Sequence, residues 1–376
     1  MGLFILRRLG VMLLTALCLT FIVFFLTNLY PNLEKLAKTQ GNQRMSDAAV
    51  VSWLTSRGYR SEVDPAFIDA AIKGDVSNEE FNAAVDGFDF RLFRNYGEWL
   101  GVIPGYVIEG NDGEVRARCA NHGTPDEETA TFCGIIQGNW GFSSVFKNDV
   151  GTIISTRLGL TGKLMFWVMV LMVPSALIVG VLAGMREGSR LDRSLSTFSI
   201  ASTATPEYVS GVIFITLLAS SAGVKWFKGT ATSAADNATF ENFFLPVLTI
   251  SLYGMGYIAR MTRASMTEVM TAQYIRTARL KGVSFRNIVV KHALRNALIA
   301  PFTVIMLQFP WLLNGVVIVE TLFNYKGFGW TLVQAAGNND IDLLLACSVV
   351  AVFVVLVTQL ISDIGYVFLN PRIRIA

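Results

Sequence analysis

Six stretches of about 20 residues each are apolar enough to cross a lipid bilayer, and they constrain the fold more than any other feature. They cover roughly residues 9–29, 164–185, 195–222, 243–261, 297–321 and 343–369. The composition agrees, because 52% of the residues are hydrophobic and only 16% are charged, against about 25% in ordinary soluble domains. The sequence therefore predicts an all-α polytopic membrane protein with six transmembrane helices.

Two of the six stretches need separate arguments. The fourth is the least apolar, because Tyr253, Gly254, Gly256 and Tyr257 dilute it, but glycine is common in membrane helices. The first follows two arginines, as in a cleaved signal, but it is long and ends without a small-x-small cleavage site. We therefore expect both to remain as membrane helices.

The distribution of charge predicts the orientation. The segments assigned to the inner side hold 15 Lys and Arg residues against Glu187, Asp192 and Glu268, whereas residues 30–150 hold 18 acidic residues against 11 basic ones. Cytoplasmic loops carry the excess of Lys and Arg. Both termini are therefore expected in the cytoplasm, and residues 30–150 form a large outer insertion. No nucleic-acid partner is expected.

The outer insertion carries local signals for short helices and a hairpin. Asp64-Pro65 and the run from Ser77 to Glu80 are typical helix starts. Two strand-like runs flank Asn111-Asp112-Gly113, which is a hairpin signal. Cys119 and Cys133 lie in this segment, where a disulfide would close a loop of about 15 residues and stabilise the fold by about 3 kcal/mol. Two free thiols are the alternative. Cys18 and Cys347 fall inside membrane helices.

A basic loop between the fourth and fifth apolar stretches has the spacing of a helix-turn-helix. It contains YIRTARLKG, residues 274–282, followed by FRNIVVKHAL. Tyr274, Ala278 and Lys281 are spaced to share a helix face, and Gly282 is placed to end that helix. Such a shape fits a groove on another protein. The alternative is a solvated loop that fixes topology or contacts anionic lipid.

The sequence shows no arrangement typical of an enzyme. Gly162-Lys163 lacks the rest of a GxxxxGK[ST] phosphate-binding loop. His122 and His292 lie in separate segments, and no nucleophile or acid–base pair stands out, so no metal or catalytic site is expected. Charges within membrane helices mark transport pathways by default, which makes Glu320 and Asp363 candidates. The alternative is that each carboxylate pairs with a neighbour near a helix end.

Several motifs, in order along the chain, resemble one family. They are FILRRLG at the start, GNWGFS at residues 138–143, LAGMREGSRLDR, the basic loop itself, VIVETLFNYKGFGW and SDIGYVFLNPRIR. Together they resemble the dipeptide/oligopeptide/nickel branch of binding-protein-dependent permeases of ABC importers, whose EAA loop the basic loop matches. Three departures stand out. Lys326-Gly327 replaces a Pro-Gly, Asn370-Pro371-Arg372 replaces an Asp-Pro-Arg, and about thirty residues separate EWLGVI from GIIQGNWG.

The resemblance implies a membrane subunit without its own ATPase site, in a bacterial inner membrane. Its partners would be a second homologous permease, two ABC ATPase subunits that hold ATP and magnesium, and a periplasmic substrate-binding protein; no cofactor is expected in this chain. The implied parts are an N-terminal helix (1–29), a periplasmic lobe (30–150) and a permease core (151–376) with a coupling loop at 262–296. The implied ATPase-coupling residues are Tyr274, Arg276, Thr277, Ala278, Arg279, Lys281, Gly282 and Arg286.

The resemblance also implies ATP-driven import by alternating access. Di- or oligopeptides are the expected substrates, with nickel complexes, glutathione and other conjugates as alternatives. A self-sufficient secondary transporter is a different class, which more often shows an internal repeat and acidic residues deep in its helices. A membrane-anchored scaffold is a third class, but it leaves the basic loop unexplained. The family reading is therefore the one we favour.

Overall fold

The computed structural model describes residues 2–85, 87, 89–109, 113–120 and 123–369. The chain divides into two compact units. The bundle unit comprises Met1–Leu9, Arg157–Val333 and Phe353–Ala376, and the lobe unit comprises Gly10–Thr156 and Gln334–Val352. These units differ from the three parts expected from the sequence. The reason is that Phe24, Ile341 and Leu345, from apolar stretches, belong to the hydrophobic core of the lobe unit.

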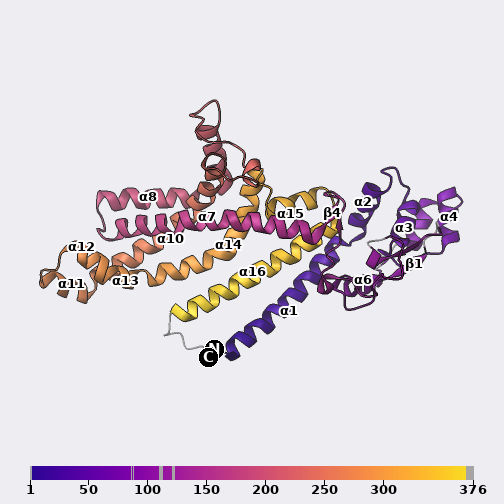
Figure 1. Ribbon diagram of the computed structural model, residues 1–376, viewed down its shortest axis with the longest axis horizontal. Helices are drawn as coiled ribbons and strands as arrows, with labels where there is room; N and C mark the ends of the chain where they lie inside the picture. Colours follow the sequence, from indigo (N-terminus) through magenta and orange to yellow (C-terminus); the bar gives the residue numbers. More distant parts are fainter. Residues whose placement is uncertain (1, 86, 88, 110–112, 121–122, 370–376) are drawn as a thin grey trace. The chain divides into compact units, whose positions relative to one another are not determined.

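Most described residues are helical (Figure 1). The long helices are α1 (Gly2–Thr27), α7 (Val150–Gly184), α8 (Arg190–Ala204), α10 (Phe240–Thr271), α14 (Ile299–Leu322) and α16 (Ile341–Leu369). Shorter helices of the bundle unit are α9 (Glu207–Phe214), α11 (Gln273–Leu280), α12 (Phe285–Asn287) and α13 (Leu294–Ala297), and α15 (Phe328–Gly337) precedes α16. Helical turns at Ile215–Ala219, Thr232–Ala234 and Ile288–Ala293 complete this part of the chain.

Among the described residues, four helices are long and apolar enough to cross a membrane, and up to six spans result if each of two bent pairs counts as one. The straight spans are Leu6–Thr27, Val150–Gly184, Phe240–Thr271 and Ile341–Gly365. The bent pairs are Arg190–Ala204 with Glu207–Ala219, at 104°, and Phe285–Ala297 with Ile299–Gln308, at 50°. The chain is therefore a helical, polytopic membrane protein.

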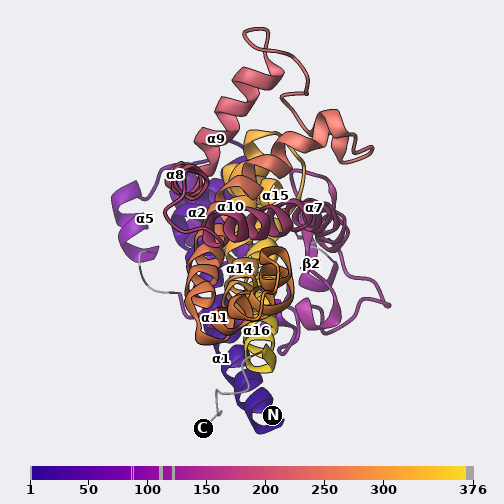
Figure 2. The same ribbon diagram turned by 90° about the vertical axis from the view of Figure 1, so that its left-hand side faces the viewer.

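The apolar stretch predicted as one membrane helix over residues 195–222 is divided by a bend into two helices. α8 ends at Ala204, Thr205 is extended (φ −90°, ψ 118°), and α9 starts after Pro206. A residue before proline is pushed out of the helical region by the proline ring, so the apolar run continues while the helix axis turns. Figure 2 shows α9 leaving the direction of α8.

α10 is the central helix of the bundle unit, with α7, α8 and α14 alongside it (Figures 1 and 2). Its glycines explain this position. A Cβ atom at Gly254 would lie 2.2 Å from Met172 of α7, and one at Gly256 would lie 2.1 Å from the hydroxyl of Ser202 of α8. Small residues let membrane helices approach closely. The least apolar of the predicted spans is therefore the one that faces other helices.

The lobe unit holds most of the short helices. They are α2 (Tyr30–Gln40), α3 (Asp47–Thr55), α4 (Pro65–Lys73), α5 (Asn78–Val85) and α6 (Arg91–Leu100). The two predicted helix starts are confirmed, because the Asp64 carboxylate accepts a hydrogen bond from the backbone N–H of Ala66 (2.9 Å) and the Ser77 hydroxyl accepts one from that of Glu80 (3.2 Å). Leu36, Leu54 and Trp99 are buried in the main core of the unit.

The lobe unit also contains the predicted hairpin. β1 (Val107–Glu109) pairs antiparallel with β2 (Val115–Ala117), with Val107 opposite Ala117. The predicted turn residues Asn111 and Asp112 lie outside the described residues. Beyond the hairpin, Cys119 and Cys133 form a disulfide with their Cα atoms 5.4 Å apart. A second short pair, β3 (Phe142–Ser143) and β4 (Asn148–Asp149), precedes α7.

Candidate functional site

The basic loop forms the helix and bend that the sequence predicts. α11 covers Gln273–Leu280, and Gly282 follows with a positive φ of 73°. The N–H of Val283 donates to the carbonyl of Ala278 (3.2 Å), and that of Gly282 donates to the carbonyl of Arg279 (3.0 Å). This pair of bonds is a Schellman motif, which ends helices at a left-handed residue that is usually glycine. Gly282 therefore sets the angle between α11 and α12.

One face of α11 is exposed, and it differs in one respect from the predicted face. Leu280 is 83% exposed and Tyr274 is 43% exposed, whereas Ala278 is only 7% exposed. Ala278 lies on the inner face with Ile275, within a buried cluster that includes Met266 and Met270 of α10. Ala278 therefore lies on the inner face of α11, away from Tyr274, with which the spacing had grouped it. Exposed residues of the predicted set are Tyr274, Arg276, Thr277, Arg279, Lys281, Gly282 and Arg286.

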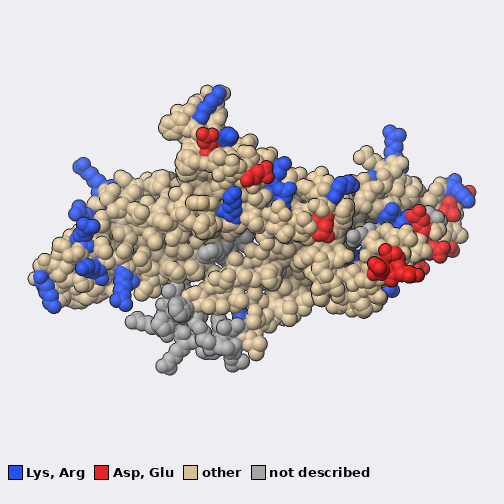
Figure 3. Space-filling view, in the orientation of Figure 1, with Lys and Arg blue, Asp and Glu red and all other residues tan. Residues whose placement is uncertain are grey.

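The exposed face combines basic and apolar groups. Figure 3 shows Lys and Arg side chains gathered over α11 and α12 on the visible face of the bundle unit. Leu280, which the sequence analysis did not assign to the site, lies among them on α11. The phenolic oxygen of Tyr274 accepts a hydrogen bond from the side-chain amide of Asn296 (3.0 Å), which fixes its position. Such a surface fits a groove with apolar and acidic lining.

An ion pair with a buried carboxylate joins the start of α8 to α10. Arg263 donates from Nε to Oδ1 of Asp192 (2.6 Å) and from Nη2 to Oδ2 (2.8 Å). Asp192 is 2% exposed and also accepts hydrogen bonds from the N–H of Gly188 (2.9 Å) and the hydroxyl of Ser196 (3.0 Å). From the sequence, both residues enter only as charges of the inner segments. The Ser189-x-x-Asp192 spacing of a helix start was the signal that could have singled out Asp192.

Both pathway candidates have partners within the bundle unit. Oε1 of Glu320 accepts a hydrogen bond from the Thr161 hydroxyl (2.5 Å), and Oε2 accepts one from the N–H of Trp330 (3.0 Å). Glu320 is fully buried, so it ties the end of α14 to α7 and to the start of α15. Asp363 forms an ion pair with Arg8 (2.5 Å) in which both side chains are about one-third exposed. These contacts match the alternative of a carboxylate paired with a neighbour.

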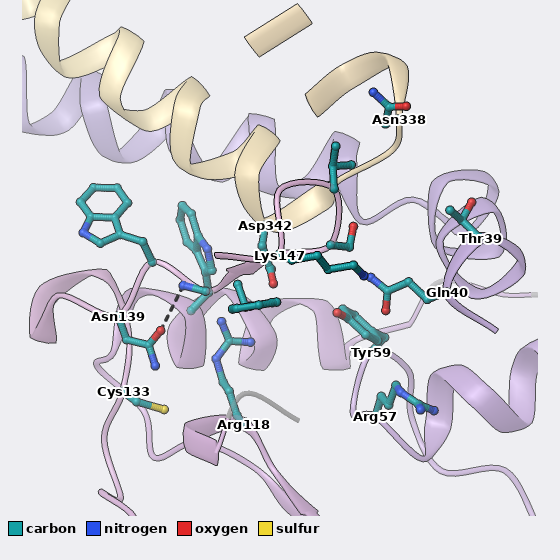
Figure 4. A pocket seen from close by; sticks show the side chains of 16 residues that line it. Thr39, Gln40, Arg57, Tyr59, Arg118, Cys133, Asn139, Lys147, Asn338 and Asp342 are labelled. Atoms are coloured by element: carbon teal, nitrogen blue, oxygen red, sulfur yellow. Dashed lines mark hydrogen bonds between the residues drawn. The ribbon is translucent and has the colours of Figure 1, made fainter. Parts of the chain in front are cut away.

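A polar cavity of about 560 Å³ lies within the lobe unit. Figure 4 shows Arg118 and Asp342 directed into the same space from opposite sides, with Tyr59 beside them. Burial and the negative charge of Asp342 raise the pKa of the Tyr59 hydroxyl well above its ordinary value, so the phenol stays neutral. Cys133 of the disulfide lines the cavity. Across the described part of the chain, no group of three His, Cys, Asp or Glu residues could hold a metal ion.

Comparison with known proteins gives the chain relatives over most of its length. Residues 176–375 match the family described as "Binding-protein-dependent transport system inner membrane component". The probable peptide ABC transporter permease protein y4tP of Sinorhizobium fredii is 34% identical over 243 residues, which cover 64% of this chain and 77% of that protein. The oligopeptide transport system permease protein AppB of Bacillus subtilis is 33% identical over 246 residues, with 64% and 77% covered.

A third relative carries a different name. The glutathione transport system permease protein GsiC of Escherichia coli K12 is 33% identical over 239 residues, which cover 64% of this chain and 76% of that protein. The family match spans the described residues of α8 to α16, including the basic loop. The chain therefore belongs to the family of binding-protein-dependent transport system inner membrane components.

Proposed function

We propose that this chain is one membrane subunit of an ATP-driven ABC importer that moves peptides from the periplasm to the cytoplasm. The family membership and the names of two relatives as peptide or oligopeptide permeases support this function. In this proposal six helices, two of them bent, span the inner membrane, both termini are cytoplasmic and residues 30–150 are periplasmic. A second homologous permease completes the translocation path.

The exposed face of α11 carries the proposal. It docks into a groove of an ABC ATPase subunit, with Leu280 and Tyr274 as apolar contacts and Arg276, Arg279 and Lys281 as polar ones. ATP and magnesium are held by two such ATPase subunits, and a periplasmic binding protein delivers the peptide. The inner face of α11 packs on Met266 and Met270 of α10 through Ile275 and Ala278. A displacement of α11 therefore acts directly on the central helix of the bundle.

The proposed cycle is alternating access. Closure of the ATPases on ATP shifts α11, and α10 moves with it as a rigid body, since interfaces of packed helices switch between discrete arrangements. The bidentate contact between Asp192 and Arg263 makes the start of α8 follow α10. The membrane helices then open to the periplasm under the docked binding protein, and ATP hydrolysis returns them to the inward-open state.

Purification from the native membrane in mild detergent, followed by mass spectrometry, tests the assembly. We expect a second permease and two ATPase subunits in near-equal amounts, and uptake by the reconstituted complex that requires ATP and the binding protein. A chain that purifies alone and drives uptake from a proton or sodium gradient contradicts the proposal. That result would identify a self-sufficient secondary transporter.

A further inference from the structure

The cavity of the lobe unit has opposite charges and aromatic walls in one space. Arg57, Arg118 and Lys147 bring positive charge, and Asp342 brings a carboxylate. Trp99, Trp140 and Phe142 line the same cavity. Its volume, about 560 Å³, lies within the range of about 300–1,000 Å³ that is usual for small-molecule sites. Neither the family membership nor the proposed docking of α11 uses this cavity.

The cationic side of the cavity is held in place by covalent and backbone contacts. The N–H of Arg118 donates to the carbonyl of Tyr106 (3.0 Å) at the base of the hairpin. Arg118 directly precedes Cys119, whose disulfide partner Cys133 also lines the cavity. The backbone that carries the guanidinium is therefore fixed before a ligand arrives, which lowers the entropic cost of binding.

The carboxylate side is held equally well. Asp342 lies in the first turn of α16 and accepts a hydrogen bond from the N–H of Phe142. Two residues earlier, Asp340 accepts hydrogen bonds from the Ser143 hydroxyl (2.6 Å) and from the N–H of Val145 (3.1 Å). The segment that carries Trp140 and Phe142 is thus attached to the start of α16. Asp342 and the aromatic walls form one unit of structure.

We propose that this cavity binds a short peptide by its two charged ends, the α-carboxylate at Arg118 and the α-ammonium at Asp342. Arg57 and Lys147 strengthen the carboxylate side, and the aromatic walls accept the side chains. A simple anion fits less well, because Asp342 repels it, whereas a zwitterion satisfies both charges. The assignment of a peptide rests on the proposed function. A phosphoethanolamine headgroup has the same pair of charges, so the experiment must separate the two sources.

Calorimetry with the purified chain alone in lipid nanodiscs tests the proposal, with alanyl-phenylalanine as the probe. Three ligands are compared: the free dipeptide, its C-terminal amide and its N-acetyl derivative. The wild-type chain should bind either blocked form with at least tenfold lower affinity than the free dipeptide. The Arg118→Gln chain should bind the free dipeptide and its C-terminal amide with equal affinity. The Asp342→Asn chain should bind the free dipeptide and its N-acetyl derivative with equal affinity. This pattern assigns each charged end to its residue, because coupled groups give non-additive losses.

Control variants with matched charge changes and nanodiscs of two lipid compositions are also compared. Arg44→Gln and Asp69→Asn make the same charge changes at exposed positions of the lobe unit outside the cavity and should bind like the wild type. Arg118→Lys keeps the charge and should retain most of the affinity. If Arg118→Gln does not fold, the three ligands on the wild-type chain still decide. Nanodiscs are made with phosphatidylglycerol alone or with added phosphatidylethanolamine.

The outcomes separate this proposal from the proposed function. Equal affinity for the free and blocked dipeptides, or no binding at millimolar concentration, overturns the peptide site. It is also overturned if glycerophosphoethanolamine binds with dependence on Arg118 and Asp342 while the dipeptide does not. Neither result affects ATP-driven uptake, because the assay contains no ATPase. Conversely, gradient-driven uptake by the chain alone contradicts the importer while the binding data stand.

Discussion

Arg263 of α10 makes a bidentate contact with Asp192 of α8, in which Nε donates to Oδ1 at 2.6 Å and Nη2 donates to Oδ2 at 2.8 Å. The Asp192 carboxylate is almost fully buried and has two further donors, from Gly188 and Ser196. Bidentate pairs of this kind are directional as well as strong. The start of α8 is therefore fixed to α10, the same helix that packs against α11.

Asp192→Asn should weaken this connection. The amide loses the charge that pairs with Arg263. We therefore expect the free energy of unfolding to fall by about 1.5–3 kcal/mol, the contribution of a charge-assisted hydrogen bond, and the melting temperature to fall with it. ATP hydrolysis by the assembled complex should persist while uptake falls. Glu268→Gln, an exposed charge change on the same helix, is the control. Strict additivity between Asp192→Asn and Arg263→Gln would show that the two side chains do not act as a pair.

Substitution of Gly282 should uncouple hydrolysis from uptake. Its φ of 73° costs a residue with a Cβ about 1–2 kcal/mol, although a Cβ there would meet no atom within 4 Å. Uptake should fall from Gly282→Asn to Gly282→Ala to Gly282→Trp, since asparagine tolerates the left-handed region best and tryptophan adds bulk at the bend. Normal uptake per ATP in the tryptophan variant would remove the assignment of α11 as the coupling helix.

Glu320 distinguishes a structural role from a pathway role. Glu320→Ala leaves the Thr161 hydroxyl and the N–H of Trp330 without their acceptor, and each unsatisfied buried group costs about 1–3 kcal/mol. We expect a clear loss of thermal stability, with Glu320→Gln intermediate and still active in uptake. A Glu320→Ala variant that melts like the wild type but does not transport would instead place the carboxylate in the pathway.

Loss of the disulfide should destabilise the lobe unit. Cys119 and Cys133 are 14 residues apart, and a loop of this size contributes about 3 kcal/mol in the chain-entropy account. The Cys119→Ser/Cys133→Ser double variant should exchange amide hydrogens faster between Gly105 and Gly138, with helices of the bundle unit unchanged. Cys347→Ser, at a free cysteine, is the control. Unchanged exchange in that segment would mean that neighbouring contacts alone hold it.

The sequence predicts the features that depend on local chemistry. Asp64 caps α4 because a carboxylate before a proline suits a helix start, and the hairpin forms where two short strand-like runs face one another. Apolar length alone cannot locate a bend such as that at Thr205, where the following proline changes the backbone without changing hydropathy. Gly254 and Gly256 weakened a predicted span, although they allow α10 its central position.

The residues of the candidate site also fall into those that local sequence predicts and those that depend on tertiary packing. Gly282 could be placed from its residue type, since few other residues adopt its backbone conformation. The direction in which Ala278 faces depends on the packing of Met266 and Met270 behind it, which spacing within one helix does not reveal. Asp192 and Arg263 lie 71 residues apart in sequence, so only the tertiary structure brings them together. Arg118 and Asp342 are also far apart in sequence, and only the tertiary structure brings both to the cavity.

The most direct test of the central claim is photo-crosslinking from a benzoylphenylalanine placed at Leu280, an apolar side chain of α11 that is 83% exposed. Ile72 of α4, half exposed in the lobe unit, is the matched control position. We expect a covalent product with an ABC ATPase subunit from position 280, in intact cells, and none with that subunit from position 72. Absence of an ATPase product from position 280, or equal products from both positions, would contradict the account.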